Sequence, residues 1–276
     1  MKELNYPLIL SDFDGTLLRS DETVSEETIC AINAYKAAGG RFALCTGRML
    51  SSALQVAKNL GITGLVACFQ GSIVADIESE ELVVDGYLDN AGAAEVCKFF
   101  QEENHHFHVY DTYDYYANMD DQWLHHYERI VGAKAIVKAD ESLAAFVETA
   151  PIKVRKIIAL VDPKEKAKLY EQLQERFGDR YYITYSAAFM LEVSSKAYSK
   201  ATALEKIAEY YGLMPEQAIA VGDNFNDLPM IERAGLGVAV KNAEDVLKEK
   251  ADLVLERSND EDGVACLIRN YAMKTN

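Results

Sequence analysis

Residues 7–16 read PLILSDFDGT, and this stretch decides the fold. Its apolar first half predicts a buried strand, and two carboxylates, Asp12 and Asp14, follow directly. Strand residues two apart point to the same side, so both carboxylates can face one site, and Gly15 allows a sharp turn beyond them. Ligands of open α/β sheets bind beyond the carboxyl ends of the strands. Two acids at that place can act as a nucleophile and a proton donor, or as metal ligands; the plainer alternative is a polar turn.

Short apolar strands alternate with helices near both ends of the chain. The first part predicts strands at 41–45 and 65–69, helices at 25–38 and 51–60, and a hairpin within 72–88. The alternation resumes after Ser194, with helices at 199–211 and 227–234, strands at 217–221, 236–240 and 252–255, and a last helix from Asp262. Such alternation predicts a doubly wound sheet of parallel strands, which are buried on both faces.

From about Asp89 onward, in the middle of the chain, the order of predicted strands and helices changes. Strand candidates lie at 105–110, 113–119, 154–161, 181–185 and 189–193, with helices between them and an unassigned stretch before residue 154. Adjacent strands of this kind indicate an antiparallel sheet covered on one face. We therefore predict an α/β fold with a doubly wound, Rossmann-like parallel-sheet core formed by residues 1–86 and 190–276, and an α+β cap domain inserted at 87–189.

Composition narrows the class of protein and of partner. The 276 residues are 49% hydrophobic and 26% charged, as in a globular protein, and the net charge is −16. A surface this acidic repels nucleic acid and anionic lipid, so neither is an expected partner. We expect no signal peptide, because the apolar run 8–10 is too short for one and leads into acidic residues. We also expect no membrane span, because no stretch approaches the roughly 20 apolar residues that a span needs. Five scattered cysteines without a C-x-x-C pattern are expected to be buried, reduced thiols of a cytoplasmic protein. The protein is expected to be a monomer or a homodimer.

Polar clusters follow two further strands and open one helix. Thr46-Gly47-Arg48 lies at the end of the second strand, where a hydroxyl and backbone N–H groups can donate hydrogen bonds to phosphate oxygens. Residues 222–227, Gly-Asp-Asn-Phe-Asn-Asp, offer two acids and two amides after an apolar strand. Lys200 lies in the first turn of a helix, where it opposes the helix dipole and can instead neutralise phosphate.

Each cluster also has a plainer interpretation. Thr46-Gly47 can simply begin a loop, and Asp227 can cap the helix that follows it. Lys200 can be a solvated surface lysine, and Lys196 is a nearby competitor for its role.

The clustered acids predict a bound cation. Four carboxylates beside a phosphate dianion would be strongly unfavourable without one, and an all-oxygen ligand set suits Mg²⁺ rather than zinc. A zinc site is the weaker alternative, because the histidines lie in the middle segment without the spacing of a zinc site. These histidines are His105, His106, His108, His125 and His126.

In this order and at strand ends, the motifs resemble the haloacid dehalogenase-like phosphatases, in their Cof-type branch with a type IIB cap. The resemblance spans the whole chain and rests on Asp12-Phe13-Asp14-Gly15-Thr16-Leu17-Leu18, Cys45-Thr46-Gly47-Arg48, Lys200 and residues 222–227. Two departures are Gln70-Gly71-Ser72 in place of Asn-Gly-Ala, and Ala201 in place of a glycine after the lysine.

The resemblance implies a role for each matching residue. Asp12 would be the nucleophile, and Asp14 would be the general acid and later the base. The phosphoryl group would be bound by Thr46, Gly47, Lys200 and Asn226. Magnesium would be held by Asp12, the Asp14 backbone carbonyl and Asp223, with Asp227 as a support behind them.

The expected function is therefore that of a Mg²⁺-dependent phosphatase acting through an aspartyl-phosphate. Its substrate would be a small phosphorylated metabolite, such as a sugar phosphate, a nucleotide or a phosphorylated cofactor. The inserted domain would close over the site and select the substrate. The insert's aromatic run is expected to pack its own sheet, with a stacking surface for a sugar or base as the alternative; the run is Tyr110, Tyr113, Tyr115, Tyr116, Trp123 and Tyr127. Alternative functions are a phosphosugar mutase using the same Asp pair, a receiver-like signalling module, and a non-catalytic phosphometabolite-binding protein.

Overall fold

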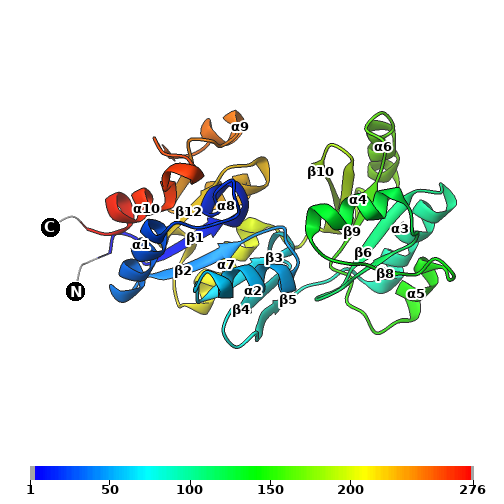
Figure 1. Ribbon diagram of the computed structural model, residues 1–276, viewed down its shortest axis with the longest axis horizontal. Coiled ribbons are helices and arrows are strands. Elements are labelled where there is room, and N and C mark those ends of the chain that lie inside the picture. The colour runs from blue at the N-terminus through cyan, green and yellow to red at the C-terminus, as the bar shows by residue number, and fades with distance from the viewer. Residues whose placement is uncertain (1–3, 275–276) are drawn as a thin grey trace. The chain divides into compact units, whose positions relative to one another are not determined.

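A computed structural model describes residues 4–274, without the side chains of residues 186 and 187. The chain divides into two compact units: one holds the residues up to Asp85 and from Ala197 onward, and the other holds Gly86–Lys196 (Figure 1). The expected boundary at 189/190 falls inside a hairpin, because β10 (Tyr181–Ala187) pairs with β11 (Met190–Ser195). Both strands therefore stay together in the second unit, which runs to Lys196.

The first unit is built on an eight-stranded, mostly parallel sheet of the kind that the alternating pattern predicted. The strand order is β14-β13-β12-β1-β2-β3-β4-β5. Its strands are β1 (Leu8–Asp12), β2 (Arg41–Cys45), β3 (Leu65–Cys68), β4 (Ile73–Asp76), β5 (Leu82–Asp85), β12 (Ala218–Gly222), β13 (Leu236–Ala239) and β14 (Leu253–Val254). Neighbours from β14 to β3 run parallel, whereas β4 and β5 form the predicted antiparallel hairpin at one edge. Leu8, Ile9 and Leu10 of the central strand are fully buried, as parallel strands covered on both faces should be.

Helices and short turns connect these strands. The helices are α1 (Glu26–Ala37), α2 (Leu50–Asn59), α7 (Lys200–Tyr210), α8 (Leu228–Arg233), α9 (Asp245–Lys248) and α10 (Gly263–Leu267). The turns η1 (Phe13–Leu17), η2 (Phe69–Gly71) and η4 (Phe225–Asp227) follow β1, β3 and β12. The predicted cap of α1 is present, since the Thr28 N–H donates to the Ser25 hydroxyl at 3.0 Å. α7 packs against β2, β3 and β4, which places its first residue, Lys200, beside the end of β1.

The second unit contains a six-stranded sheet of its own, in the order β10-β11-β9-β6-β7-β8. Its other strands are β6 (His106–Tyr110), β7 (Tyr115–Ala117), β8 (Ile136–Val137) and β9 (Lys156–Leu160). The helices are α3 (Asn90–Glu102), α4 (Gln122–Val131), α5 (Leu143–Thr149) and α6 (Lys166–Phe177). Pairing is antiparallel as predicted, except that β7 and β8 run parallel. The stretch that the sequence left unassigned forms β8 and α5.

Helices lie on both faces of the second sheet, not on one as the sequence suggested, and they cover the second face in part, since Tyr182 of β10 is 48% exposed. Phe107 and Val109 of β6 belong to the apolar core that includes residues of α3, α5 and α6. His108, which lies between them in the strand, points to the opposite face of the sheet, and its ring lies 4.7 Å from that of Tyr127 on α4. α4 therefore packs against the second face, since Leu124 and Tyr127 are both buried.

The aromatic run divides between core and surface. Tyr110, Tyr115 and Tyr127 are buried, and the rings of Tyr110 and Tyr115 stack at 5.0 Å. Packing within the unit is thus confirmed for these three. It also holds for Tyr116, which packs on Phe146 at 4.9 Å, and for Trp123, which stacks on Phe189 at 6.1 Å, whereas Tyr113 is 48% exposed.

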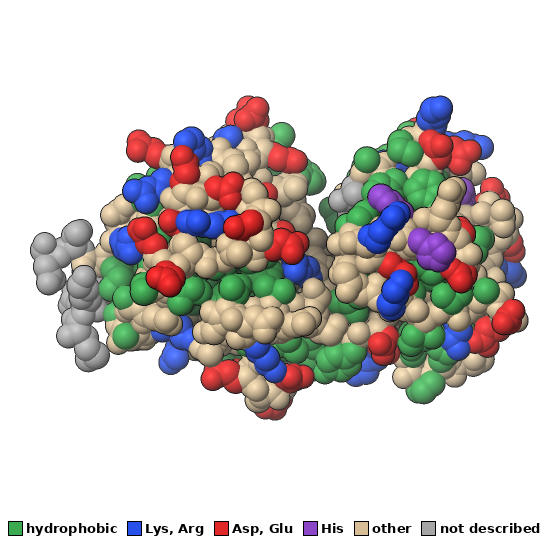
Figure 2. Space-filling view, in the orientation of Figure 1, with side chains coloured by type: hydrophobic (Ala, Val, Ile, Leu, Met, Phe, Trp, Pro, Cys, Tyr) green, Lys and Arg blue, Asp and Glu red, His purple; other side chains and the backbone are tan. Residues whose placement is uncertain are grey.

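Surface charge of both signs is mixed over the first unit. On the face shown in Figure 2, Lys and Arg side chains of the described residues lie scattered among Asp and Glu, without a continuous basic patch. Among residues 4–274, no helix has the length and apolar character to cross a membrane. The five cysteines are free, and Cys45, Cys68 and Cys97 are buried as expected. Cys30 is exposed and Cys266 half-buried, so burial of all five was wrong.

Candidate active site

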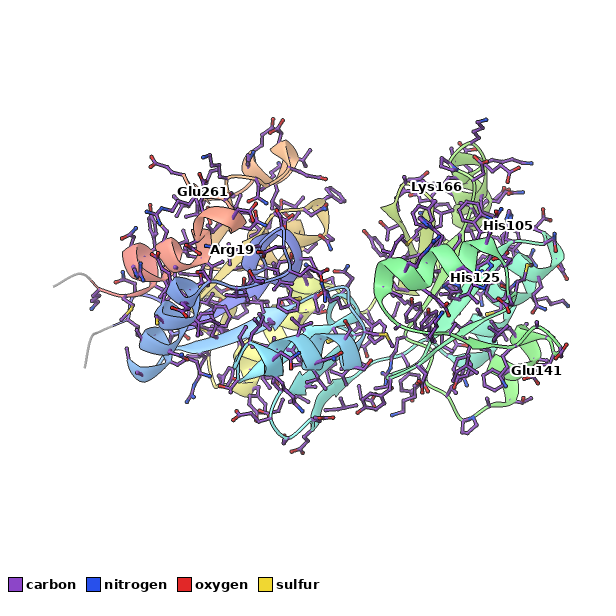
Figure 3. The ribbon with its side chains drawn as sticks, in the orientation of Figure 1. Arg19, His105, His125, Glu141, Lys166 and Glu261 are labelled. Atoms are coloured by element: carbon purple, nitrogen blue, oxygen red, sulfur yellow. The ribbon has the colours of Figure 1, made fainter. Side chains whose placement is uncertain are left out.

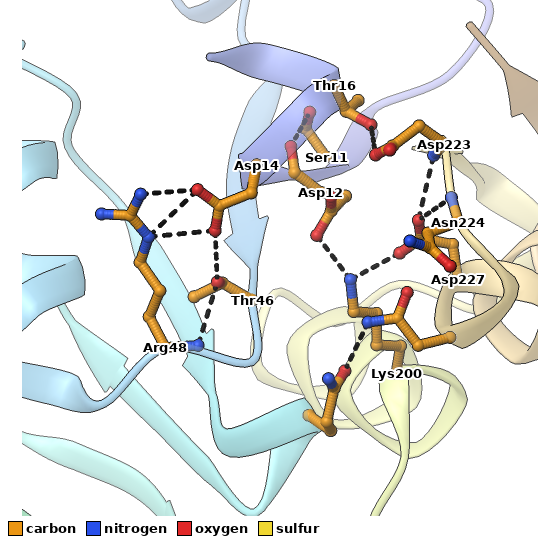
Figure 4. A network of polar contacts seen from close by, with 12 residues as sticks. Ser11, Asp12, Asp14, Thr16, Thr46, Arg48, Lys200, Asp223, Asn224 and Asp227 are labelled. Atoms are coloured by element: carbon orange, nitrogen blue, oxygen red, sulfur yellow. Dashed lines mark hydrogen bonds and ion pairs between the residues drawn. The ribbon is translucent and has the colours of Figure 1, made fainter. Parts of the chain in front are cut away.

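The candidate site lies at the carboxyl ends of three neighbouring strands. Asp12 ends β1, Thr46 follows β2, and Asp223 follows β12. Because β12, β1 and β2 are adjacent and parallel, their ends meet at one edge of the sheet. Figure 4 shows the polar contacts that connect these residues with Lys200 at the start of α7. The predicted site residues are thus brought together within the first unit.

Lys200 is the centre of a buried ion network. Its Nζ lies 2.5 Å from Asp12 Oδ1 and 2.5 Å from Asp227 Oδ1. Lys200 is 1% exposed and Asp227 is fully buried, so the interpretation of Lys200 as a surface lysine was wrong. Lys196, the competitor, instead donates to the Asp179 carbonyl oxygen in the second unit at 3.3 Å.

Burial dominates the electrostatics of this network. It raises the pKa of Asp12 well above its ordinary range; the charge of Asp227 adds to the rise and that of Lys200 opposes it. Burial alone would lower the pKa of Lys200, but attraction to Asp12 and Asp227 outweighs it and raises that pKa. Burial also raises the pKa of Asp223. Three carboxylates thus share one ammonium group, which leaves a deficit of positive charge at the site.

A cation fits this deficit. One ligand atom from each of Asp12, Asp223 and Asp227 lies within 4.8 Å of the others. Among the described side chains, this is the one group of three acids, histidines or cysteines that could hold a metal ion. An all-oxygen donor set suits Mg²⁺. Gly15 is part of the same enclosure, because a Cβ there would lie 2.5 Å from Asp223 Oδ2. The chain at Gly15 can pass so close because it has φ +77° and no side chain.

The histidines do not form a comparable cluster. His106 and His108 face each other with 2.7 Å between their Nε2 atoms, while His125 binds Asp120 on the surface at 2.8 Å. Figure 3 labels His105 and His125 on the second unit. Among the described residues, the histidines therefore belong to no group of three ligands that could hold zinc.

Asp227 shapes the turn after β12. Its Oδ2 accepts from the backbone N–H groups of Asp223 and Asn224, at 3.0 and 2.9 Å. With Oδ1 bound to Lys200, both oxygens have partners within the protein. Asp223 is held separately, since the Thr16 hydroxyl donates to its Oδ1 at 2.7 Å. Thr16 lies inside the D-x-D-G-T motif, but sequence reasoning gave it no role.

Asp14 points away from Asp12, toward the loop after β2 (Figure 4). Arg48 Nε donates to Asp14 Oδ2 at 2.9 Å, and the Thr46 hydroxyl lies 3.4 Å from the same oxygen. The argument that residues two apart in a strand share a side does not extend to Asp14, because the strand ends at Asp12 and the turn η1 begins. Arg48 is a further residue of the site that its motif contained but sequence reasoning did not assign.

Comparisons with known proteins point to one family of hydrolases. A family model described as a haloacid dehalogenase-like hydrolase matches residues 9–268. A Haemophilus influenzae protein is 30% identical over 270 residues, covering 95% of this chain and 97% of its own. A 5-amino-6-(5-phospho-D-ribitylamino)uracil phosphatase of Bacillus subtilis is 28% identical, covering 96% and 97%. A crystal structure from Thermotoga maritima has a TM-score of 0.88 and 28% identity over 98% of each chain.

Proposed function

Because the chain belongs to the haloacid dehalogenase-like hydrolases, and is a phosphoric monoester hydrolase of that family, we propose that it releases phosphate from a small metabolite by way of an aspartyl-phosphate on Asp12. The observation that carries this proposal is the buried contact between Lys200 Nζ and Asp12 Oδ1, at 2.5 Å. A carboxylate held beside a buried ammonium is presented to an anionic substrate without charge repulsion from that side.

The first step transfers the phosphoryl group to the protein. A carboxylate oxygen of Asp12 forms a bond to phosphorus while the bond from phosphorus to the ester oxygen breaks, and Asp14 gives its proton to the leaving oxygen. Lys200 offsets the negative charge of the phosphoryl oxygens. The Thr46 hydroxyl, the Gly47 N–H and the Asn226 amide donate hydrogen bonds to them.

The second step regenerates Asp12. A water molecule forms a bond to phosphorus and gives a proton to Asp14, and the bond from phosphorus to Asp12 breaks. The products are inorganic phosphate and the original carboxylate, so atoms and charges balance over the two steps. Asp227 keeps Lys200 and the turn after β12 in place throughout.

A magnesium ion would be held by the Asp12 carboxylate, the Asp14 backbone carbonyl and Asp223. When bound, it supplies positive charge that offsets the phosphoryl oxygens. Asp227 is the third carboxylate of the cluster, but its oxygens are engaged by Lys200 and by backbone N–H groups. We therefore assign Asp227 a supporting role.

The relatives suggest where to look for the substrate. Two Bacillus subtilis proteins of 27–28% identity are named as phosphatases of 5-amino-6-(5-phospho-D-ribitylamino)uracil. We place that compound first in a panel that also holds sugar phosphates, nucleotides and phosphorylated cofactors. The net charge of −16 disfavours polyanionic substrates such as nucleic acids.

The proposal is tested by hydrolysis of p-nitrophenyl phosphate with Mg²⁺, with EDTA, and by the variant Asp12→Asn. We expect turnover that requires both Mg²⁺ and Asp12, and a phosphorylated peptide containing Asp12 after acid quenching and mass spectrometry. Asp12→Asn keeps the size of the side chain, and its thermal unfolding is measured alongside as a folding control. Undiminished turnover by a folded Asp12→Asn variant would rule out the nucleophile assignment.

A further inference from the structure

The turn η2 is tied to the phosphate-binding loop after β2. The backbone N–H groups of Phe69 and Gln70 donate to the carbonyl oxygens of Arg48 and Thr46, each at 3.1 Å. Both donors have left-handed backbone angles, with φ of 49° and 59°. That region favours glycine and asparagine, so a glutamine with φ +59° is a costly choice at this position.

The same turn also lies against two other parts of the site. A Cβ on Gly71 would lie 2.5 Å from the carbonyl oxygen of Ser199, the residue that caps α7 just before Lys200. The Gln70 Oε1 accepts a hydrogen bond from Asn226 Nδ2 at 3.3 Å. The turn thus touches the loop after β2, the start of α7 and the turn η4.

The Gln70 amide sits between two proposed phosphate-binding groups. Its Oε1 is occupied by Asn226, and its Nε2 lies 2.7 Å from where a Cβ on residue 47 would be. Gly47 therefore leaves room for the amide, and a larger residue at 47 would displace it. The carboxamide of Gln70 offers an acceptor for Asn226 and a donor on its other side.

We propose that Gln70 is a positioning residue that orients the Asn226 carboxamide for the phosphoryl group. This inference rests on the proposed function, in which Asn226 contacts the phosphoryl oxygens. Asn226 is exposed, so its side chain would otherwise sample several rotamers and lose that freedom on binding. A hydrogen bond that selects one rotamer in advance reduces the entropy lost on binding.

The test uses the variant Gln70→Gly, which removes the amide but suits the left-handed backbone. We expect KM for p-nitrophenyl phosphate, and Ki for inorganic phosphate as a competitive inhibitor, each to rise by about fivefold. The melting temperature should not fall, and kcat should change by less than about twofold. Glu80→Gly is the matched control, because Glu80 has φ 61° and pairs with Lys58 on the surface. It should leave KM and Ki as in the wild type.

A double-mutant cycle with Asn226→Ala separates positioning from a direct contact. If Gln70 acts through Asn226, adding Gln70→Gly to Asn226→Ala should cause no further rise in KM or Ki. Additive effects, unchanged KM and Ki in Gln70→Gly, or a lower melting temperature with a lower kcat would each overturn the inference. Failure of the proposed function would appear differently, as turnover by a folded Asp12→Asn variant equal to that of the wild type.

Discussion

Arg48 holds Asp14 with two nitrogen atoms of its guanidinium group. Nε lies 2.9 Å from Asp14 Oδ2, and Nη2 lies 2.5 Å from Oδ1. The Arg48 guanidinium also lies 5.3 Å from the centre of the Phe13 ring, which limits its own movement. Because this planar pair fixes the direction of the Asp14 carboxyl group, Arg48 sets where the proposed proton donor points.

Replacing Arg48 should therefore impair proton transfer more than binding. For Arg48→Ala we expect kcat to fall by about tenfold with an alkyl phosphate, whose leaving group needs a proton, and by less with p-nitrophenyl phosphate. Steady-state kinetics with both substrates give the comparison. Arg48→Lys keeps the charge but loses the contact through two nitrogen atoms, so its kcat should lie between those of the wild type and Arg48→Ala. An equal rise in KM for both substrates, with kcat unchanged, would instead make Arg48 a substrate-binding residue.

Asp14→Asn should uncouple the two proposed steps. The nitrophenolate leaves without a proton, so Asp12 can still be phosphorylated, but no base remains to activate water. We expect a burst of about one nitrophenol per active site, followed by turnover reduced by about 10²- to 10⁴-fold. Rapid-mixing absorbance measurements detect the burst. Asp12→Asn serves as the control and should show none, and slow turnover without a burst would argue against this role of Asp14.

Magnesium should stabilise the folded protein through Asp223. Binding to the folded state alone adds about 1.4 kcal/mol when the free ion is at ten times its Kd. We expect Mg²⁺ to raise the melting temperature of the wild type in differential scanning fluorimetry, and EDTA to reverse the rise. Asp223→Asn should lose most of this shift, whereas Asp114→Asn, a change in the second unit, should keep it. Equal shifts in all three proteins would show that the ion binds elsewhere.

Stability should fall in mild acid because of two histidines in the second unit. Burial lowers the pKa of His106 and, further, of His108; nearby Asp121 opposes the shift at His106, and His106 adds to the shift at His108. Their Nε2 atoms are 2.7 Å apart, so both rings cannot be charged in the folded state. An unfolded histidine takes up a proton at about pH 6.5, so the unfolded state binds more protons below that pH. The contribution of these two histidines to stability is complete above about pH 6.5 and is lost as the pH falls toward their lower pKa values in the folded state.

Urea unfolding between pH 7.5 and pH 5, a range chosen to span about 6.5, measures this effect. Each extra proton bound by the unfolded state contributes up to about 1.4 kcal/mol per pH unit. His108→Phe fills a similar volume between Tyr115 and Tyr127 and should flatten the pH dependence. Parallel curves for the variant and the wild type would show that His108 does not carry the effect.

Most of the first unit could be predicted because its signals are local. An apolar run such as Leu8–Asp12 must be buried on both faces, and polar residues after it must lie at the sheet's edge. The burial of Lys200 was harder to predict, because its partners Asp12 and Asp227 lie 188 and 27 residues away. The direction of Asp14 depends on backbone angles in η1 and on Arg48, which residue types alone do not specify.

The second unit was predicted less completely, because some of its elements leave no local pattern in the sequence. β8 is only two residues long and both are exposed, so it leaves no apolar pattern. The side on which α4 packs is decided by His108 and Tyr127, two polar aromatics that hydropathy does not mark as core. The residues that sequence reasoning assigned no role, Thr16 and Arg48, act on other side chains of the site, and only their contacts show it.

The central place of β1 has a consequence for how the protein is made. One neighbour of β1 is β2, which leaves the ribosome soon after it, and the other is β12, which follows the whole of Gly86–Lys196. The nascent chain must therefore keep one edge of an apolar strand unpaired while the inserted unit, which is continuous in sequence and has its own core, is synthesised and can fold. Lys200 and Asp227 also follow the inserted unit in sequence, so Asp12 meets its ionic partners only after that unit has been synthesised.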